Sequence, residues 1–419
     1  MSQNTSEAKV HKAGTVESLL SELEKLPIIE RRGYIEDWLI HFAPSNPLFE
    51  ETEDSEQLSC TLFVNEKSID TWRNLYLVGD SFGWDEPQFN LEKIKNTSWW
   101  YISINRLKGS QLHYLFSPNE VGTLISPHER LERRKNWFFD PRNKINVETV
   151  ERTHSVLQFP GYCEIPEISA DRVPFSSFRV PKKLEGNRTI QIASFTQNGE
   201  TPEHLLVLHD GESLIKHLQI DRQIQQGVID GRWPSMVVLS LSISPEDRRR
   251  EYDCNNTKYP DFIADSAVPA LEEELSITFD PKNTTLLGTS IGGWGAFDVV
   301  WNRNDRIKNV ICHSSPWWWT ENEPNYFLNT VQDSKKERID KIYLDCGIYE
   351  TGRKPLSTYD SNVEFTNILK KKKYNYMARE LMMGHRYHSW KWALSGGFDF
   401  IFNDERHYGP LPGREMHLS

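Results

Sequence analysis

From residue 204 onward the sequence alternates between strand-like and helix-like segments, and this alternation constrains the fold more than any other feature. Apolar runs rich in β-branched residues predict strands at residues 204–209, 236–242, 284–288, 309–314, 341–347 and 376–383. Apolar residues at helical spacing predict helices at residues 261–275, 294–301 and 361–373. Because a helix between two strands returns the chain beside the first strand in the same direction, we expect a mostly parallel sheet with helices on both faces.

The residues before this region have a different texture. Strand-like runs rich in aromatic and β-branched residues recur at residues 60–64, 74–79, 99–104 and 112–116, separated by Gly, Asp, Asn and Pro. Short strands with turns between them are typical of a small antiparallel sandwich. The sequence therefore predicts an α/β domain preceded by an all-β domain.

Changes in composition divide the chain into four expected parts. Residues 1–57 predict a helical or flexible leader, with helical spacing at Val16–Leu23 and Tyr34–Phe42 and an acidic linker at Glu50–Glu56. The other parts are a β-sandwich that would cover the substrate, a linker in which four prolines exclude a continuous helix, and the α/β domain, at residues 58–159, 160–185 and 186–419.

Charge and cysteine usage exclude several function classes. The 60 acidic residues outnumber the 49 Lys and Arg residues, for a net charge of −11, and an acidic protein repels nucleic acid at long range. The five cysteines are scattered without CxxC spacing, which argues against a zinc site or a disulfide framework. We find neither an apolar signal segment at the start nor a membrane-spanning run, so we expect a cytoplasmic protein without nucleic-acid or membrane partners.

The run Gly288-Thr289-Ser290-Ile291-Gly292 lies directly between a predicted strand and a predicted helix. In α/β-hydrolases a serine in this context occupies a sharp turn that exposes its hydroxyl, and small flanking residues let strand and helix approach. The sequence therefore predicts Ser290 as a nucleophile and the N–H of Ile291 as an oxyanion donor. The alternative is an ordinary glycine-rich turn.

A serine nucleophile needs a base, and the base needs an acid, in the chain order Ser, Asp or Glu, His. His385 follows a predicted strand and is the expected base, with His388 as the alternative, whereas His313 is expected to be structural. Glu350 lies in the loop after the strand at 341–347 and is the expected acid. Asp345, within that strand, is the alternative acid.

A second oxyanion donor is expected from the loop after an early strand. Asp210-Gly211-Glu212 follows the strand at 204–209, and Gly211 permits the sharp turn that would aim the N–H of Glu212 into the site. The alternative is a plain Asp-Gly turn, which is common.

Six runs in this order resemble motifs of the enterochelin (enterobactin) esterases, which are cytoplasmic hydrolases of ferric catecholate siderophores. One of them is the turn around Ser290, extended to Gly293; we call residues 288–293 the elbow. The others are Leu208–Glu212, Arg248–Asn255, Ser314–Trp318, Asp345–Glu350 and Gly384–Trp390. The resemblance covers roughly residues 58–405. Arg386, where the family usually has an acidic residue, and His209, where an apolar residue is common, depart from it.

The resemblance implies a seryl ester substrate with catechol arms and bound Fe(III), so that iron arrives with the substrate and the protein needs no metal or cofactor of its own. Arg248 would contact catecholate oxygens, and Trp317 and Trp318 would stack on catechol rings. The alternatives are an ion pair of Arg248 with Glu251 and structural packing of the tryptophans. A general carboxylesterase, an acyl or peptide hydrolase, and a non-catalytic siderophore-binding protein remain alternative functions.

Overall fold

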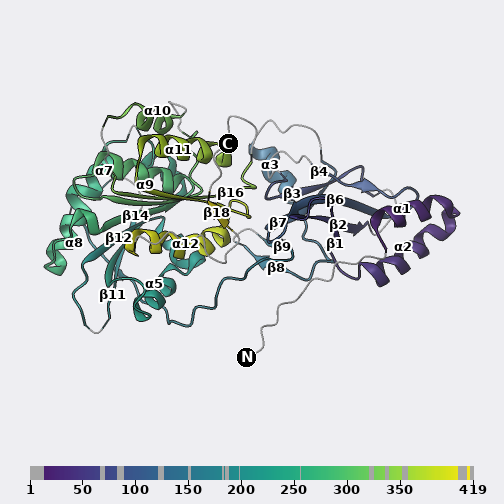
Figure 1. Ribbon diagram of the computed structural model, residues 1–419, viewed down its shortest axis with the longest axis horizontal. Helices are drawn as coiled ribbons and strands as arrows, with labels where there is room; N and C mark the ends of the chain where they lie inside the picture. The colour runs from purple at the N-terminus through teal and green to yellow at the C-terminus, as the bar shows by residue number, and fades with distance from the viewer. Residues whose placement is uncertain are drawn as a thin grey trace. The chain divides into compact units, whose positions relative to one another are not determined.

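The computed structural model describes residues 14–66, 71–82, 89–120, 127–149, 152–181, 184, 188–197, 199–254, 256–319, 325–335, 339–351, 357–403 and 413–415. The chain forms two compact units (Figure 1), the first comprising Met1–Cys163 with Met382–Gly384 and the second Glu164–Leu381 with His385–Ser419. No helix among the described residues is long and apolar enough to cross a membrane.

The first unit contains two antiparallel sheets. One has the strand order β1-β2-β6-β5, with bounds Leu48–Glu51, Gln57–Asn65, Trp99–Leu107 and Glu92–Lys93. The other has the order β4-β3-β7-β9-β8, with bounds Phe89–Asn90, Leu75–Gly79, Gln111–Pro118, Thr153–Gln158 and Asn146–Glu148. A short helix, α3 (Pro127–Arg134), lies between β7 and β8 in the chain.

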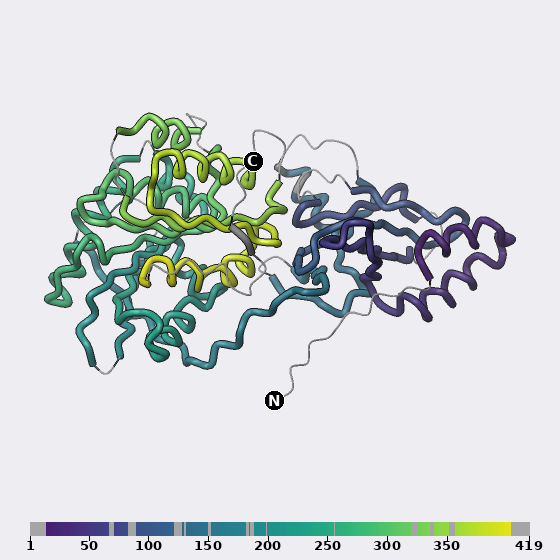
Figure 2. The backbone as a smooth tube through the Cα atoms, in the orientation of Figure 1, coloured from purple at the N-terminus to yellow at the C-terminus, as the bar shows by residue number. Residues whose placement is uncertain are grey.

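Between residue 14 and the first strand, the chain forms the helices α1 (Val16–Lys25) and α2 (Ile28–Phe42). They lie side by side (Figure 2), and their apolar residues share one buried cluster with Leu48, Phe63 and Trp99 of the adjacent sheet. The helices thus belong to the core of the first unit. The prediction of an acidic linker at Glu50–Glu56 is wrong at its start, because Leu48–Glu51 pairs with β2 as an antiparallel strand.

The second unit is a mixed α/β fold around one nine-stranded sheet of order β10-β11-β13-β12-β14-β15-β16-β17-β18. In that order the strands are Ser176–Ser177, Arg188–Phe195, Met236–Ile243, His204–His209, Thr284–Thr289, Asn309–His313, Lys341–Gly347, Tyr376–Leu381 and Gly413–Glu415. The strands from β13 to β17 pair in parallel, and β10, β11 and β18 pair antiparallel at the two edges. Because Ser176–Ser177 is already part of this sheet, the predicted linker at residues 160–185 extends too far.

Helices cover both faces of this sheet (Figure 1). On one face lie α7, η2, α8, α9, α10 and α11, with bounds Lys258–Phe262, Ile263–Ala267, Val268–Leu275, Ile291–Asn302, Tyr326–Asp333 and Thr358–Lys372. On the other lie η1, α5 and α12, at Leu214–Leu218, Ile220–Ile229 and Tyr387–Asn403, with the short α4 (Gly211–Ser213) leading into η1. The described part of this unit also contains α6 (Pro245–Glu251) and η3 (Pro281–Asn283).

The parallel strands bring their carboxyl ends to one edge of the sheet, where open α/β sheets place their functional groups. The strands β12, β14 and β15 end at His209, Thr289 and His313, so Asp210, Ser290 and Ser314 follow at neighbouring positions. Glu350 and His385 lie in the segments that leave β16 and β17.

Candidate active site

Ser290 occupies a strained turn between β14 and α9. Its φ of 56° and ψ of −132° lie outside the conformations that non-glycine residues ordinarily adopt. The turn is held by the Ser290 N–H, which donates to the His313 carbonyl over 2.8 Å. A Cβ at Gly288 would lie 2.1 Å from the Gly292 carbonyl oxygen, so only glycine allows strand and helix to approach this closely.

The structure brings Ser290, His385 and Glu350 together in one hydrogen-bonded chain. His385 Nε2 lies 2.9 Å from Ser290 Oγ, and His385 Nδ1 lies 2.7 Å from Glu350 Oε2. The Glu350 side chain is almost fully buried, whereas the His385 side chain is 39% exposed. This arrangement fixes the imidazole with Nδ1–H toward the carboxylate and leaves Nε2 to accept the serine proton.

The two alternatives weighed for the acid and base occupy other positions. Asp345 Oδ2 lies 2.6 Å from His313 Nδ1, and both side chains are fully buried. Strand alternation explains this, since Asp345 is inside β16 and its side chain points into a sheet face, whereas Glu350 follows the strand end. Of the two histidines considered as the base, it is His385 that contacts Ser290. Burial lowers the pKa of the other, His388.

Two predicted oxyanion donors differ in their surroundings. Ile291 is the first residue of α9 and directly follows Ser290, so its N–H has no acceptor within the helix. The N–H of Glu212 donates to the Ser242 hydroxyl over 2.8 Å. Ile291 is therefore the better placed of the two predicted donors, because the Glu212 N–H is already engaged by a side chain.

Arg248 on α6 lies behind the elbow. Its Nε and Nη2 donate to both carboxylate oxygens of Asp210 over 2.7–2.9 Å, and Nη2 also reaches the Thr289 carbonyl at 3.2 Å. The expected alternative partner of Arg248 was Glu251, which pairs with Arg188 instead. Arg248 thus ties the loop after β12 to Thr289, the residue that precedes Ser290.

His209, the last residue of β12, packs against the start of α9 and against Tyr252. Its ring stacks on Tyr252 with centroids 4.7 Å apart, and Nδ1 lies 2.9 Å from the Gly292 carbonyl oxygen. Burial lowers the pKa of His209 to about 4, so the ring is neutral at pH 7 and its Nδ1–H donates to that carbonyl. The sequence departure at His209 therefore supports the elbow helix.

The expectation that Trp317 contacts substrate is wrong. Its side chain is fully buried, stacks on Phe365 at 3.9 Å, and donates its indole N–H to Asn362 over 2.9 Å. Trp318 is partly exposed and remains the candidate aromatic contact. Whether a tryptophan ring is buried or exposed depends on tertiary contacts, so the sequence alone could not distinguish Trp317 from Trp318.

Sequence reasoning missed two residues of this site, Ser314 and Trp390. The Ser314 hydroxyl donates to Glu350 Oε1 over 2.6 Å, and the Trp390 indole N–H donates to the Ser314 hydroxyl over 2.8 Å. Both residues lie in motifs that carry the resemblance, which was the available signal. A buried hydroxyl and an indole have no chemistry of their own to mark them as functional.

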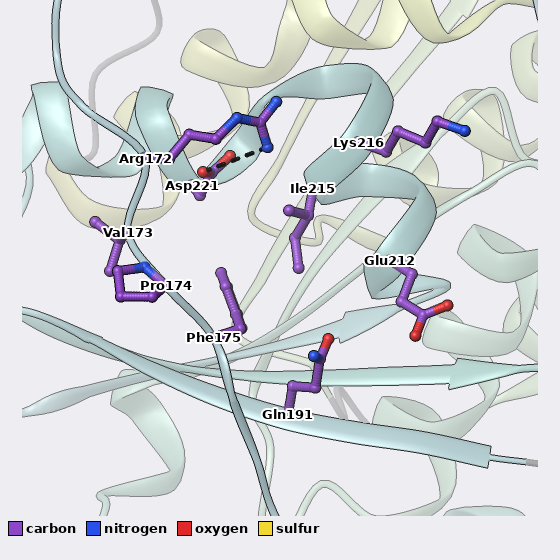
Figure 3. Close-up of a pocket in the computed structure, with 9 residues that line it drawn as sticks. All are labelled: Arg172, Val173, Pro174, Phe175, Gln191, Glu212, Ile215, Lys216 and Asp221. Carbon is purple, nitrogen blue, oxygen red and sulfur yellow. Dashed lines mark ion pairs between the residues drawn. The ribbon is translucent and has the colours of Figure 1, made fainter.

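A cavity of about 410 Å³ lies beside Glu212 (Figure 3). Residues 172–175 cross one side of it, η1 and the start of α5 form another, and Gln191 of β11 lies across from them. Arg172 and Asp221 form an ion pair of 3.9 Å there. Within the described ranges, no cluster of three or more His, Cys, Asp or Glu side chains is arranged to hold a metal ion.

Similar folds are known among solved structures. The ferric enterobactin esterase from Salmonella typhimurium superposes with a TM-score of 0.67 at 18% identity, covering 87% of this chain and 98% of that one. The enterobactin esterase from Shigella flexneri, solved in the presence of enterobactin, gives a TM-score of 0.65 at 19% identity and covers 87% and 97%. At such identities the likeness shows the fold.

Sequence comparison extends this likeness to a family. The iron(III) salmochelin esterase of Escherichia coli is 28% identical over 134 residues, so that the match spans 31% of this chain and 33% of that relative. The family model described as "Putative esterase" matches residues 182–401, slightly more than half of the 419 residues, and includes the elbow, Glu350 and His385. The chain therefore belongs to this esterase family.

Proposed function

We propose that the protein is a serine esterase that hydrolyses the ester bonds of a ferric catecholate siderophore, built as an α/β-hydrolase on a largely parallel sheet. The observation that carries the proposal is the hydrogen-bonded chain from Ser290 through His385 to Glu350, with links of 2.9 and 2.7 Å. These three residues are the proposed nucleophile, base and acid.

The reaction follows from this geometry. Ser290 Oγ attacks the ester carbonyl carbon while its proton passes to His385 Nε2, and the carbonyl oxygen becomes an oxyanion beside the N–H of Ile291. The intermediate collapses, the ester C–O bond breaks, and His385 returns the proton to the departing alcohol. Water then attacks the acyl-enzyme with His385 again as base, releasing the acid and restoring Ser290.

The substrate class rests on the relatives and on the chemistry around Ser290. Proteins named as esterases of enterobactin and iron(III) salmochelin share the fold or part of the sequence. Trp318 offers an aromatic face for a catechol ring, and Arg248 offers the guanidinium nitrogen that neither Asp210 nor Thr289 uses. Iron enters with the substrate, and we place the reaction in the cytoplasm, as the resemblance implies.

The test compares two substrates with two variants. We expect Ser290→Ala to lower kcat/KM for a ferric tricatecholate trilactone by about a thousandfold or more, because a triad acts as a unit. Ser395→Ala, a partly exposed serine on α12, is the matched control and retains activity. Hydrolysis that survives Ser290→Ala would show that another nucleophile acts.

The second comparison uses a simple aryl ester. We expect kcat/KM of the wild-type protein to favour the ferric tricatecholate by at least about a hundredfold, since distant binding contacts contribute to transition-state stabilisation. An equal or better rate with the aryl ester would indicate a general carboxylesterase. Absence of turnover with both substrates, together with tight siderophore binding, would indicate a non-catalytic binding protein.

A further inference from the structure

The catalytic acid of the proposed triad is held from two sides. Glu350 uses Oε2 for His385 and Oε1 for two donors, the Gly347 N–H at 2.8 Å and the Ser314 hydroxyl at 2.6 Å. A carboxylate with only one partner can rotate about its last bond. With both oxygens engaged, Oε2 stays directed at the imidazole.

Ser314 is built into this position at a conformational cost. It follows the end of β15 with a φ of 48°, in the left-handed region that non-glycine residues seldom adopt, and it is fully buried. Its own N–H donates to the Asp345 carbonyl over 2.8 Å, which fixes the backbone. A strained residue that persists in a buried loop indicates that its side chain has a use there.

Trp390 determines which way the Ser314 proton points. An indole N–H can only donate, so the Ser314 oxygen must be the acceptor in the 2.8 Å contact between them. The single hydroxyl proton of Ser314 is then committed to Glu350 Oε1. The same indole lies edge-on to the His385 ring, with centroids 5.0 Å apart and an interplanar angle of 89°, and restricts rotation of the imidazole.

We propose that Ser314 and Trp390 are positioning residues that act through Glu350 and His385, as one donor chain from Trp390 through Ser314 to the acid. The inference rests on the proposed triad and is independent of the siderophore. Ser314 holds the carboxylate in register, and Trp390 both orients the Ser314 proton and braces the base.

The hydroxyl also tunes the charge that faces the base. By donating to Oε1, Ser314 takes up part of the negative charge of Glu350. Without that donor, more of the negative charge stays on the carboxylate that faces the imidazole, and the carboxylate is freer to rotate. Removing the hydroxyl is therefore expected to lower kcat through the base and to leave KM, which reports on substrate binding, unchanged.

The experiment follows the rate at which a fluorophosphonate labels Ser290, which reports activation of the nucleophile whatever the ester substrate. We expect Ser314→Gly, which accepts a positive φ without strain, to slow labelling and kcat by about tenfold to a hundredfold, with KM unchanged. Ser314→Ala should lose the same factor. Normal rates in Ser314→Gly alone would assign the effect to backbone strain and overturn the proposal.

A second pair of variants tests the chain itself. Trp390→Phe keeps the ring but removes the donor, and we expect it to lower kcat several-fold, while Trp392→Phe on the same helix is the matched control. Because the Trp390 N–H reaches Glu350 only through Ser314, Trp390→Phe should add little to Ser314→Gly. If the losses in kcat of the two single variants multiply fully in the double variant, the donor chain from Trp390 through Ser314 is overturned. If wild-type Ser290 is not labelled, the proposed function fails; labelling of wild type with unchanged variants sinks only this inference.

Discussion

At the scale of single residues, the site separates groups that react from groups that hold them. Arg248 shows the difference. The resemblance implies a substrate contact, with an ion pair as the alternative, and the structure engages two of its three guanidinium nitrogens with Asp210 and Thr289. A forked guanidinium can hold both carboxylate oxygens at once, and a lysine ammonium cannot reproduce that geometry. Arg248 therefore has a supporting role whatever else it contacts.

We predict that Arg248→Lys lowers kcat for the neutral aryl ester by about tenfold, because the loop at Asp210 and the elbow lose their common clamp. Steady-state kinetics with the aryl ester checks this, since that substrate has no catecholate for Arg248 to contact. Arg250→Lys is the control, as Arg250 lies two residues away on α6 and is exposed beside Asp247. Unchanged aryl ester kinetics in Arg248→Lys would leave only a substrate-binding role.

The residues of the proposed triad could be selected from the sequence because their order and their places at strand ends follow from the fold class, and the structure brings them within hydrogen-bond distance. The choice between Glu350 and Asp345 depended on where β16 ends, and strand ends are the least certain part of a sequence pattern. Ser314 could not be predicted, since nothing in a serine marks it as a donor to a carboxylate 36 positions away. The predicted substrate contact of Trp317 was wrong for a similar reason, because the burial of this side chain depends on its contacts with Phe365 and Asn362.

At the scale of elements, α9 is unusual because it is buried along almost its whole length. Every residue from Gly292 to Trp301 is buried, so the helix that follows Ser290 runs through the core. One of them is an acid, Asp298, which accepts a hydrogen bond from Asn302 over 2.9 Å. Burial raises the pKa of Asp298 to about 8, with a smaller contribution from Asp253.

We predict that Asp298→Asn stabilises the protein at alkaline pH and changes little at pH 4. The folded-state pKa lies above the unfolded value of 3.8, so the folded state binds more protons between pH 4 and 8 and wild-type stability falls as pH rises through that window. Urea unfolding at pH 5, 7 and 9 should show that the free energy of unfolding of Asp298→Asn exceeds that of the wild type by an amount that grows with pH, to roughly a few kcal/mol.

The control for this prediction is Asp305→Asn. Arg303 lowers the pKa of Asp305 by hydrogen bonding and charge, so its carboxylate favours the folded state above its usual pKa and the amide should give no alkaline gain. A gap between wild type and Asp298→Asn that stays constant from pH 5 to pH 9 would contradict a titrating, buried Asp298.

Element type was predictable in α1, where apolar residues recur clearly at helical spacing. The predicted helical segments also fall within α2, α9 and α11 or overlap them. Strand β1 was missed because Glu50 and Glu51 give it the composition of a linker, and its pairing with β2 is a tertiary contact. The π-helical turns at Leu214–Leu218 and Ile263–Ala267 leave no mark in the sequence pattern, because they differ from α-helix by one residue per turn.

At the scale of the whole molecule, each of the two units has its own core and its own buried thiols. Cys60 lies in the first unit, and Cys312 and Cys346 lie in the second. Burial raises the pKa of all three thiols, which keeps them protonated as well as inaccessible. Cys163 and Cys254 are partly exposed, and none of the five is in a disulfide.

We predict that iodoacetamide at pH 8 modifies the native protein only at Cys163 and Cys254, and that the other three react only after denaturation. Intact mass and peptide mapping count the adducts, and the thermal midpoint should be the same with and without reductant. More than two rapid adducts in the native protein would show that a core opens readily. A reductant-dependent midpoint would reveal a disulfide.

The close approach of Gly288 to Gly292 also bears on how such a chain can evolve. A single side chain at position 288 meets the helix backbone, and one at Gly293 meets the Ser315 hydroxyl at 2.3 Å, so neither position can drift alone. A replacement at either glycine therefore requires a second change nearby, in the helix backbone or at Ser315, before its side chain can be accommodated.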